Sequence, residues 1–399
     1  MAEGREVSRR RSESLIPRGA LTLGLAAAVF GSACSAGSRT APPQTRTGSS
    51  TPSAILPTAY QGAEWRRINP IDAGFDRARL DKIALDAGKR GANCLVVIRH
   101  GRLVADWYWN GTDATTSQEV FSATKSYSST LIGIAEAEGG LSVDDKVSEY
   151  VPEWVGTSSE NVTIKDILSN VSGRHWDFDT DYRRLVRAAD RTGFAVGLAQ
   201  DAARGDVWAY NNSAIQTLDA VLTKATGRSP AAYAQERLFG LIGMSRSRMT
   251  RDGAGNTNMF SGLNSTCEDM ARFGYLFLRE GNWQGKQIVP RRWVEAATGR
   301  PSQKVNAAYG YLWWVNARGP VVDDPLKPST REQSSTAPHR RLVDGAPHDM
   351  YWALGFGGQV IQVDPGSDTV VVRLGRNVPE ARYGPADASE VVTTALVKP

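Results

Sequence analysis

Residues that bind metals or form disulfides are scarce in this chain of 399 residues. It has only three cysteines and four histidines, with no CxxC pair and no HExxH motif. Zinc sites need clusters of thiolate or imidazole ligands, so we expect no metal and no other cofactor. Cys94 opens an apolar run and Cys267 stands in the first turn of a predicted helix. We expect two buried thiols there, with a disulfide between them as the alternative.

An excess of positive charge is also missing from most of the chain. The net charge is +5, but residues 1–46 hold seven arginines and three glutamates, a net +4 that leaves +1 for everything else. A nearly neutral domain offers no electrostatic basis for binding nucleic acid. We therefore expect a small-molecule substrate as the partner, and the sequence leaves the oligomeric state open.

The apolar run near the amino terminus, "GALTLGLAAAVFGSA", is too short for a typical membrane span. It follows a basic region and precedes Cys34, which is the layout of an export signal over residues 1–34 with a lipoprotein cysteine at its end. A cleaved, soluble secreted form and an uncleaved anchor are the alternatives. Residues 35–62 are rich in Ser, Thr, Pro and Gly and predict a flexible linker. We expect an exported protein that contacts a membrane only through a lipid anchor.

The remaining residues, 63–399, predict an α+β domain. "NCLVVIRHGRLVADWYW" indicates a hairpin around His100, and "YGYLWWVN" and "YWALGFGGQVIQVDPGSDTVVVRLG" indicate strands with a turn at "DPGSD". Residues 122–300 show mainly helical periodicity, best in "NSTCEDMARFGYLFLREG", where Ser265 and Glu268 have capping-box spacing. We predict an antiparallel sheet from residues 65–120 and 300–395 around this helical insertion. Residues 316–349 lack periodicity and are a candidate lid.

Ser122 and Lys125 in "VFSATKSYSST" form an SxxK motif at the start of a strongly apolar helix. Residues three apart share a helix face, so the lysine amine can reach the serine hydroxyl and take up its proton. Two common residues at this spacing also occur by chance in a chain of this length. A lysine in the first turns of a buried helix, however, needs a partner. The chain has no GxSxG elbow, which disfavours a Ser-His-Asp hydrolase of the α/β type.

Two further segments carry candidate site residues. In "GDVWAYNNSAIQTLDAVL", Tyr210 and Asn212 precede a helix and can relay protons and hydrogen-bond to the lysine or a substrate amide; Asn212 is also a candidate helix cap. In "ALGFGGQV", glycines at the start of a strand allow a ligand to approach backbone N–H groups, or form a bulge with no ligand. Six aromatic residues are candidates for an apolar acyl pocket or for the core: Trp176, Trp208, Tyr309, Trp313, Trp314 and Trp352.

SxxK, YxN and a late glycine-rich strand, in this order, resemble the serine β-lactamase and penicillin-binding protein superfamily. The segments "LIGMSRSRM" and "GNWQGKQIVP" look like its class C branch, which includes carboxylesterases and 6-aminohexanoate-dimer hydrolases. The resemblance covers residues 65–395 and implies a β-lactamase/transpeptidase-like fold with packed amino- and carboxyl-terminal helices. It also implies a role for each motif residue: Ser122 is acylated, Lys125 and Tyr210 transfer protons, Asn212 positions Lys125 and substrate, and Phe356 donates its N–H to the oxyanion beside Gly358 and Gln359.

The third motif departs from the β-lactamase pattern. Where those enzymes and DD-peptidases carry Lys-Thr-Gly, or His in the broader group, this chain has Ala353-Leu354-Gly355. Without a cation or hydroxyl there, strong recognition of a substrate carboxylate is not expected. We therefore predict a serine hydrolase for an ester or small amide. The alternatives are a cell-wall DD-peptidase or β-lactamase, and a non-catalytic protein that binds peptidoglycan.

Overall fold

The computed structural model describes residues 64–398, which lie within one unit, Leu56–Pro399. The predicted export signal, Cys34 and the linker 35–62 lie outside the described residues. Among residues 64–398, no helix is long and apolar enough to span a membrane.

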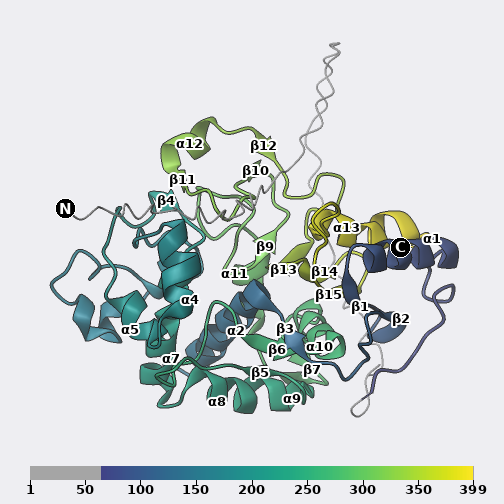
Figure 1. The fold of residues 1–399 in the computed structure, drawn as a ribbon, viewed down its shortest axis with the longest axis horizontal. Coiled ribbons are helices and arrows are strands. Elements are labelled where there is room, and N and C mark those ends of the chain that lie inside the picture. Colours follow the sequence, from purple (N-terminus) through teal and green to yellow (C-terminus); the bar gives the residue numbers. More distant parts are fainter. Residues whose placement is uncertain (1–63, 399) are drawn as a thin grey trace, which may run out of the picture. The chain divides into compact units, whose positions relative to one another are not determined.

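A six-stranded antiparallel sheet lies at one end of this unit (Figure 1). Its order is β2-β1-β15-β14-β13-β9, so strands from both ends of the domain pair directly. The strands are β1 Ala92–Arg99, β2 Arg102–Tyr108, β9 Trp314–Val315, β13 Tyr351–Gly355, β14 Gln359–Asp364 and β15 Thr369–Gly375. The predicted hairpin at His100 and the turn at "DPGSD" are confirmed. The strand predicted in "YGYLWWVN" is shorter, because Leu312 turns the chain at φ 58°.

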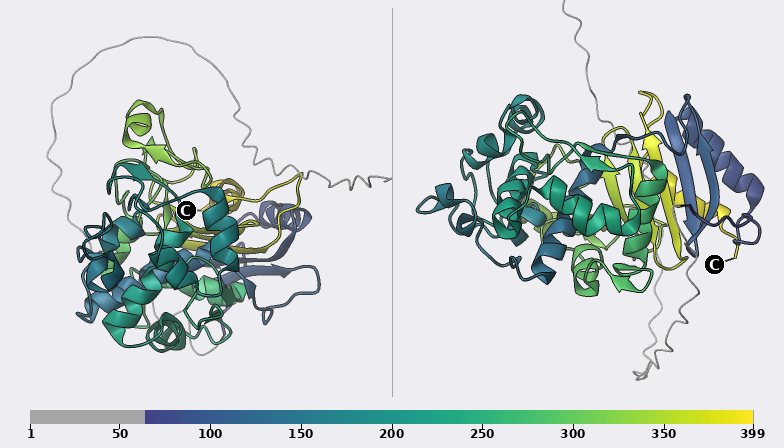
Figure 2. Two further views of the ribbon diagram at one scale, coloured as in Figure 1. Left: turned by 60° about the vertical axis from the view of Figure 1, so that its left-hand side comes forward. Right: turned by 90° about the horizontal axis from the view of Figure 1, so that it is seen from below.

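Helices cover both faces of this sheet. On one face, α1 (Arg77–Lys89), α13 (Pro385–Glu390) and the π-helix η6 (Val391–Ala395) pack together, and the right panel of Figure 2 shows the purple and yellow helices on the same side of the sheet. On the other face lies α10 (Cys267–Leu278), whose Met270, Phe273, Leu276 and Phe277 are buried as predicted. The α+β class, with packed terminal helices, is therefore confirmed.

The helical insertion lies beyond α10 and surrounds the central helix α2 (Thr124–Ala137) (Figure 1). Its other elements are η1 Phe121–Ala123, η2 Val147–Glu149, η3 Pro152–Trp154, α3 Ile164–Leu168, η4 Thr180–Arg184, α4 Leu185–Arg187, α5 Arg191–Val196, α6 Asn212–Gln216, α7 Leu218–Thr226, α8 Pro230–Ala234, η5 Gln235–Phe239, α9 Gly240–Ile242 and α11 Arg291–Thr298. Short strands connect them: β3 Gln118–Glu119, β4 Val207–Trp208, β5 Arg248–Met249, β6 Leu263–Ser265, β7 Asn282–Trp283 and β8 Lys286–Gln287.

Two local predictions at α10 need correction. The helix is capped by Thr266, whose hydroxyl accepts from the backbone N–H of Asp269, instead of by Ser265 with Glu268. Ser265 is held in β6 by its pairing with Gln118, so the helix begins one residue later. Cys94 and Cys267 form a disulfide with a Cα–Cα distance of 6.5 Å, so the expectation of two free thiols is wrong. The bond joins β1 to the start of α10.

The segment 316–349 is built from β10 (Gly319–Pro320), β11 (Ser329–Thr330), α12 (Arg331–Thr336) and β12 (His339–Arg340). Asn316 anchors its far end: its side-chain amide donates to three backbone carbonyls, among them those of Val343 and Pro347. Strand β11 pairs with β4, which ends two residues before Tyr210. This pairing brings the segment close to a predicted site residue, and its action as a lid stays a prediction.

Candidate active site

Ser122 lies in the short helix η1, directly before α2. The preceding Phe121 has φ 49°, a left-handed conformation that is strained for an aromatic residue. Thr124 holds this turn through a hydrogen bond from its hydroxyl to the carbonyl of Phe121. The serine is half-buried, while α2 is buried from Thr124 to Ala135. The sequence thus places one partly accessible hydroxyl at the start of a buried helix.

Lys125 is only 1% exposed, and its amine donates to Ser122 Oγ and to the carbonyl of Phe260, each at 2.9 Å. Both partners are neutral. Burial lowers the pKa of Lys125 to about 7, and the charge of Asp181 opposes that shift. An amine with this pKa is substantially unprotonated at neutral pH and lies in hydrogen-bond contact with the hydroxyl that it would deprotonate.

Tyr210 also packs against the amine, with its ring centroid 4.6 Å from Lys125 Nζ. Burial raises the pKa of its phenol above the ordinary value, and a hydrogen bond with the Ser122 side chain opposes this shift. The phenol is therefore protonated at neutral pH and can donate. The structure brings together the three side chains predicted as catalytic: Ser122, Lys125 and Tyr210.

Aromatic side chains hold Tyr210 in place. Its ring stacks on Trp314 at 5.9 Å, and Tyr309 and Trp208 pack around it. Half-buried Trp176 donates its indole N–H to the backbone carbonyl of Tyr210 at 3.0 Å. Two of the six candidate aromatics belong to the core instead: Trp313 packs on Phe273 and Phe277, and Trp352 donates to Gln362.

The helix cap predicted after Tyr210 needs correction. Asn211, not Asn212, caps α6, because its side chain accepts from the backbone N–H of Ala214. The backbone N–H of Asn212 donates to Asp181 at 2.5 Å. Within residues 64–398, Asn212 Oδ1 is buried without a hydrogen-bond partner. The amine of Lys125 hydrogen-bonds to Ser122 and Phe260, and the role of Asn212 in positioning Lys125 or substrate stays a prediction.

The end of β13 approaches the nucleophile closely. A Cβ atom on Gly355 would lie 2.2 Å from the carbonyl oxygen of Val120, so only glycine fits there. The next residue, Phe356, is 70% exposed, and its ring contacts Phe121 with centroids 5.8 Å apart. The turn after β13 therefore lies beside Ser122, where the predicted oxyanion donor is needed. The oxyanion role of the Phe356 N–H stays a prediction.

Gln359 and Gly358, predicted beside the oxyanion donor, are both buried behind this turn, and their contact with substrate stays a prediction. Gln359 is buried and donates to the carbonyls of Phe356 and Gly375. A Cβ atom on Gly358 would lie 2.7 Å from an Arg373 nitrogen, because that guanidinium donates to the carbonyls of Gly357 and Gly358. Both residues support the turn from the sheet side.

Three features of this site were not predicted: the carbonyl of Phe260, the guanidinium of Arg373 and the carboxylate of Asp181. They come from a loop, a central strand and a π-helix with no motif of their own. The sequence signal that could have indicated them is a polar residue, such as Asp181 or Arg373, in a segment expected to be buried, because a buried polar group needs a hydrogen-bond partner.

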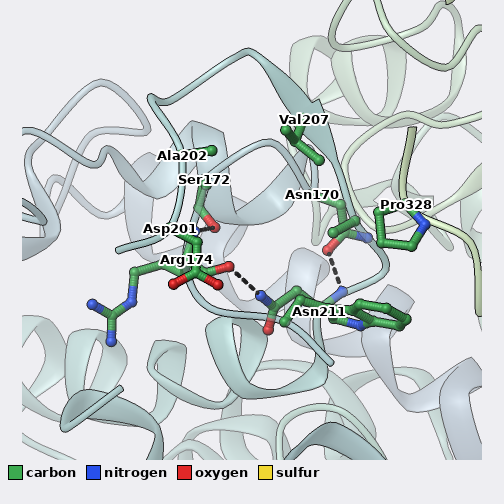
Figure 3. Close-up of a pocket in the computed structure, with 11 residues that line it drawn as sticks. Asn170, Ser172, Arg174, Asp201, Ala202, Val207, Asn211 and Pro328 are labelled. Atoms are coloured by element: carbon green, nitrogen blue, oxygen red, sulfur yellow. Dashed lines mark hydrogen bonds between the residues drawn. The ribbon is translucent and has the colours of Figure 1, made fainter. Parts of the chain in front are cut away.

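A cavity of about 110 Å³ has Trp176 among its lining residues, and Figure 3 shows a close-up of it. Asn170, Asn211 and Pro328 line it, so it includes one residue of the segment 316–349. Arg174 contributes its backbone carbonyl to a hydrogen bond with Asn211, and its guanidinium binds Ser159, Ala195 and Val196. Among the described residues no group of three or more His, Cys, Asp or Glu could hold a metal ion.

Comparisons with known proteins find relatives of this chain. The model of the Beta-lactamase family matches residues 80–395. A 6-aminohexanoate-dimer hydrolase of Paenarthrobacter ureafaciens is 24% identical over 346 residues, 80% of this chain and 82% of that protein. Penicillin-binding protein 4* of Bacillus subtilis is 27% identical over 138 residues, 33% of this chain and 30% of that protein.

Solved structures share the fold. A putative 6-aminohexanoate-dimer hydrolase from Bacillus anthracis has a TM-score of 0.59 and 22% identity, covering 74% of this chain and 76% of its own. The octameric penicillin-binding protein homologue from Pyrococcus abyssi has a TM-score of 0.59 and 19% identity, covering 79% of this chain and 76% of its own.

Proposed function

The chain belongs to the Beta-lactamase family, within the serine β-lactamase and penicillin-binding protein superfamily of hydrolases, and on this basis we propose that it is a serine hydrolase that forms an acyl-enzyme on Ser122. The observation that carries the proposal is the 2.9 Å contact between Lys125 Nζ and Ser122 Oγ inside a buried site. Such a contact suits a nucleophile that must lose its proton as it attacks.

Acylation then proceeds with a defined path for each proton. Ser122 Oγ attacks the substrate carbonyl carbon while its proton passes to neutral Lys125. The backbone N–H groups of Ser122 and Phe356 stabilise the oxyanion. When the oxyanion collapses, the bond to the leaving alcohol or amine breaks and Tyr210 donates its proton to that group. The ammonium of Lys125 returns a proton to the phenolate.

Deacylation uses the same groups in reverse. A water molecule attacks the acyl carbon after giving a proton to the Lys125–Tyr210 pair, and Ser122 leaves with a proton restored to its oxygen. The carboxylic acid is released, and the site returns to its starting protonation state. The only small molecule consumed besides the substrate is water.

We propose an ester or small amide without an essential carboxylate as substrate. Ala353 and Leu354 occupy the positions where β-lactamases and DD-peptidases carry a cation and a hydroxyl, so no side chain there can bind a carboxylate. The competing proposal is a cell-wall DD-peptidase or β-lactamase, which the penicillin-binding protein among the relatives favours. A non-catalytic peptidoglycan-binding protein would have no need of the buried amine beside Ser122.

Export, with Cys34 as a lipidated first residue, remains our proposal for the location. The disulfide between Cys94 and Cys267 supports it, because structural disulfides persist mainly outside the reducing cytosol.

The test is to treat the purified protein with a fluorophosphonate and, separately, with a fluorescent penicillin, and to map each adduct by peptide mass. We expect the fluorophosphonate alone to label Ser122. Labelling by both reagents would favour the cell-wall enzyme, and labelling by neither would favour the binding protein. Ser122→Ala should abolish ester hydrolysis without unfolding the protein; retained turnover would disprove the proposed function.

A further inference from the structure

Asp181 and Lys125 are an acid and a base that are both buried and that shift each other's pKa without forming a direct ion pair. Asp181, on η4, is fully buried, and Lys125 is 1% exposed. Among residues 64–398, the donors to Asp181 are neutral: the backbone N–H groups of Asn212 and Ser213 at 2.5 and 3.2 Å, and the Ser213 hydroxyl at 2.5 Å. The partners of Lys125 are neutral as well.

Asp181 hydrogen-bonds to the chain just after Tyr210. Its three hydrogen bonds all come from the first turn of α6, which begins two residues after Tyr210. They hold that turn against η4. The hydrogen bonds therefore restrain the short stretch of backbone that carries the phenol to its place beside Ser122.

The electrostatic consequence concerns the acylation step. When Lys125 takes the proton of Ser122, a positive charge forms where water is excluded, and such a charge is costly without an opposite one. Within residues 64–398, Asp181 is the only carboxylate with a resolved effect on Lys125, and it raises the pKa of the amine against the effect of burial. In return, Lys125 lowers the pKa of Asp181, which burial raises to about 6.

The other titratable groups around this pair cannot replace the carboxylate. Tyr210 faces the amine with its ring, and burial raises the pKa of its phenol. Tyr182, next to Asp181 on η4, has a pKa raised by burial and by the nearby Tyr210 and Asp181. Both phenols are neutral at neutral pH and supply no compensating charge.

We propose that Asp181 is a positioning residue of this active site: it holds the turn that carries Tyr210, and its carboxylate is the counter-charge for Lys125 when that amine accepts the Ser122 proton. This inference rests on the proposed hydrolase function. It gives η4, which has no catalytic motif, a defined part in the reaction.

The direct test is Asp181→Asn, which keeps the side-chain shape and removes the charge. Without the carboxylate, protonated Lys125 is less stable. We expect kcat to fall at least about tenfold with KM changed less than about threefold, and the acidic limb of the kcat/KM profile to move to lower pH by at least about half a unit.

Asp219→Asn is the matched control. Asp219, on α7, is also buried with a pKa raised to about 6, and it accepts from Thr257 and Thr192. Its charge has no resolved effect on Lys125. We expect this variant to lose stability while its acidic limb stays in place. If Asp181→Asn also leaves the limb in place, the counter-charge role is refuted.

A second measurement covers the case in which Asp181→Asn does not fold. In Lys125→Met, Asp181 loses its opposite charge, so the infrared band of protonated buried carboxyls should persist to higher pH than in the wild type. An unchanged titration of that band would overturn the inference. The infrared titration needs no turnover, so it tests the role of Asp181 separately from the proposed hydrolase function. Failure of the proposed function would show itself as retained turnover by Ser122→Ala.

Discussion

At the scale of single residues, the proposed chemistry depends on how completely Lys125 is buried. A solvated lysine would be protonated at neutral pH and could not accept a proton from Ser122. Burial lowers its pKa to about 7 from the ordinary 10.5. The folded protein therefore binds this proton less tightly than the unfolded chain does, so Lys125 costs stability below pH 10.5, and the cost is complete below about pH 7.

Lys125→Met should separate catalysis from stability. We expect kcat/KM to fall about 10²–10⁴-fold, because the general base is lost. We expect the free energy of unfolding to rise or stay equal, with any gain greatest below pH 7. Ester hydrolysis assays and denaturant titrations at pH 6 and pH 9 would measure both. Full activity in the variant would rule out Lys125 as the base.

Ala353→Lys tests the substrate preference at another single residue. Ala353 is buried in β13, so a lysine there is desolvated unless a substrate carboxylate pairs with it. We expect lower stability and a gain of about tenfold in the ratio of kcat/KM for a carboxylate-bearing ester over its neutral analogue. An unchanged ratio in a folded variant would count against our interpretation of the third motif.

At the scale of elements, the turn between β13 and β14 is held from the sheet side by buried polar groups. Gln359 binds the carbonyl of Phe356, and Arg373 binds those of Gly357 and Gly358. These contacts fix the backbone N–H that is proposed to stabilise the oxyanion. Catalysis should therefore depend on residues that never touch the substrate.

Gln359→Leu should weaken that support. We expect kcat to fall about tenfold, less than the 10²–10³-fold typical for complete loss of an oxyanion donor, with a smaller change in KM. The matched control is Gln362→Leu, on the same strand, whose side chain binds Trp352 and Ala388 in the core. Equal losses of kcat in both variants would show a general effect of burying leucine and would refute the positioning role.

Sequence patterns predicted these elements unequally well. SxxK spans one helical turn and YxN spans one loop. Because both motifs are local in the sequence, their order along the chain identifies Ser122, Lys125 and Tyr210 as candidate catalytic residues. Their partners cannot, because the carbonyl that binds Lys125 belongs to Phe260, 135 positions away. Asp181 and Arg373 lie in segments without a motif. The segment "ALGFGGQV" marks Gln359 as a candidate site residue. Only the position of Gln359 in β14 shows that its side chain binds the backbone of the turn.

At the scale of the whole molecule, two sequence-distant parts are joined covalently. The disulfide links Cys94 on β1 to Cys267 on α10 over a separation of 173 residues. No spacing rule in the sequence marks such a pair, since the two cysteines meet only when α10 packs on the sheet. Closing a long loop constrains the unfolded chain and favours the folded state.

Replacing both cysteines by serine should therefore lower the free energy of unfolding by about 2–5 kcal/mol. Denaturant unfolding of the variant, and of the wild type with and without reductant, measures this. Hydrolase activity under native conditions should be retained, because the bond lies in the sheet and its covering helix. Identical unfolding midpoints for oxidised and reduced wild type would contradict a structural role for the disulfide.

The pH dependence of the rate at which a fluorophosphonate modifies the protein, with the adduct located by peptide mass, tests the role of Lys125 most directly. We predict a single adduct on the Ser122 oxygen whose rate of formation falls as pH drops through about 7, where Lys125 becomes protonated. An adduct on another residue, or a rate on Ser122 that is constant across this range, would contradict the claim that a buried neutral lysine activates this serine.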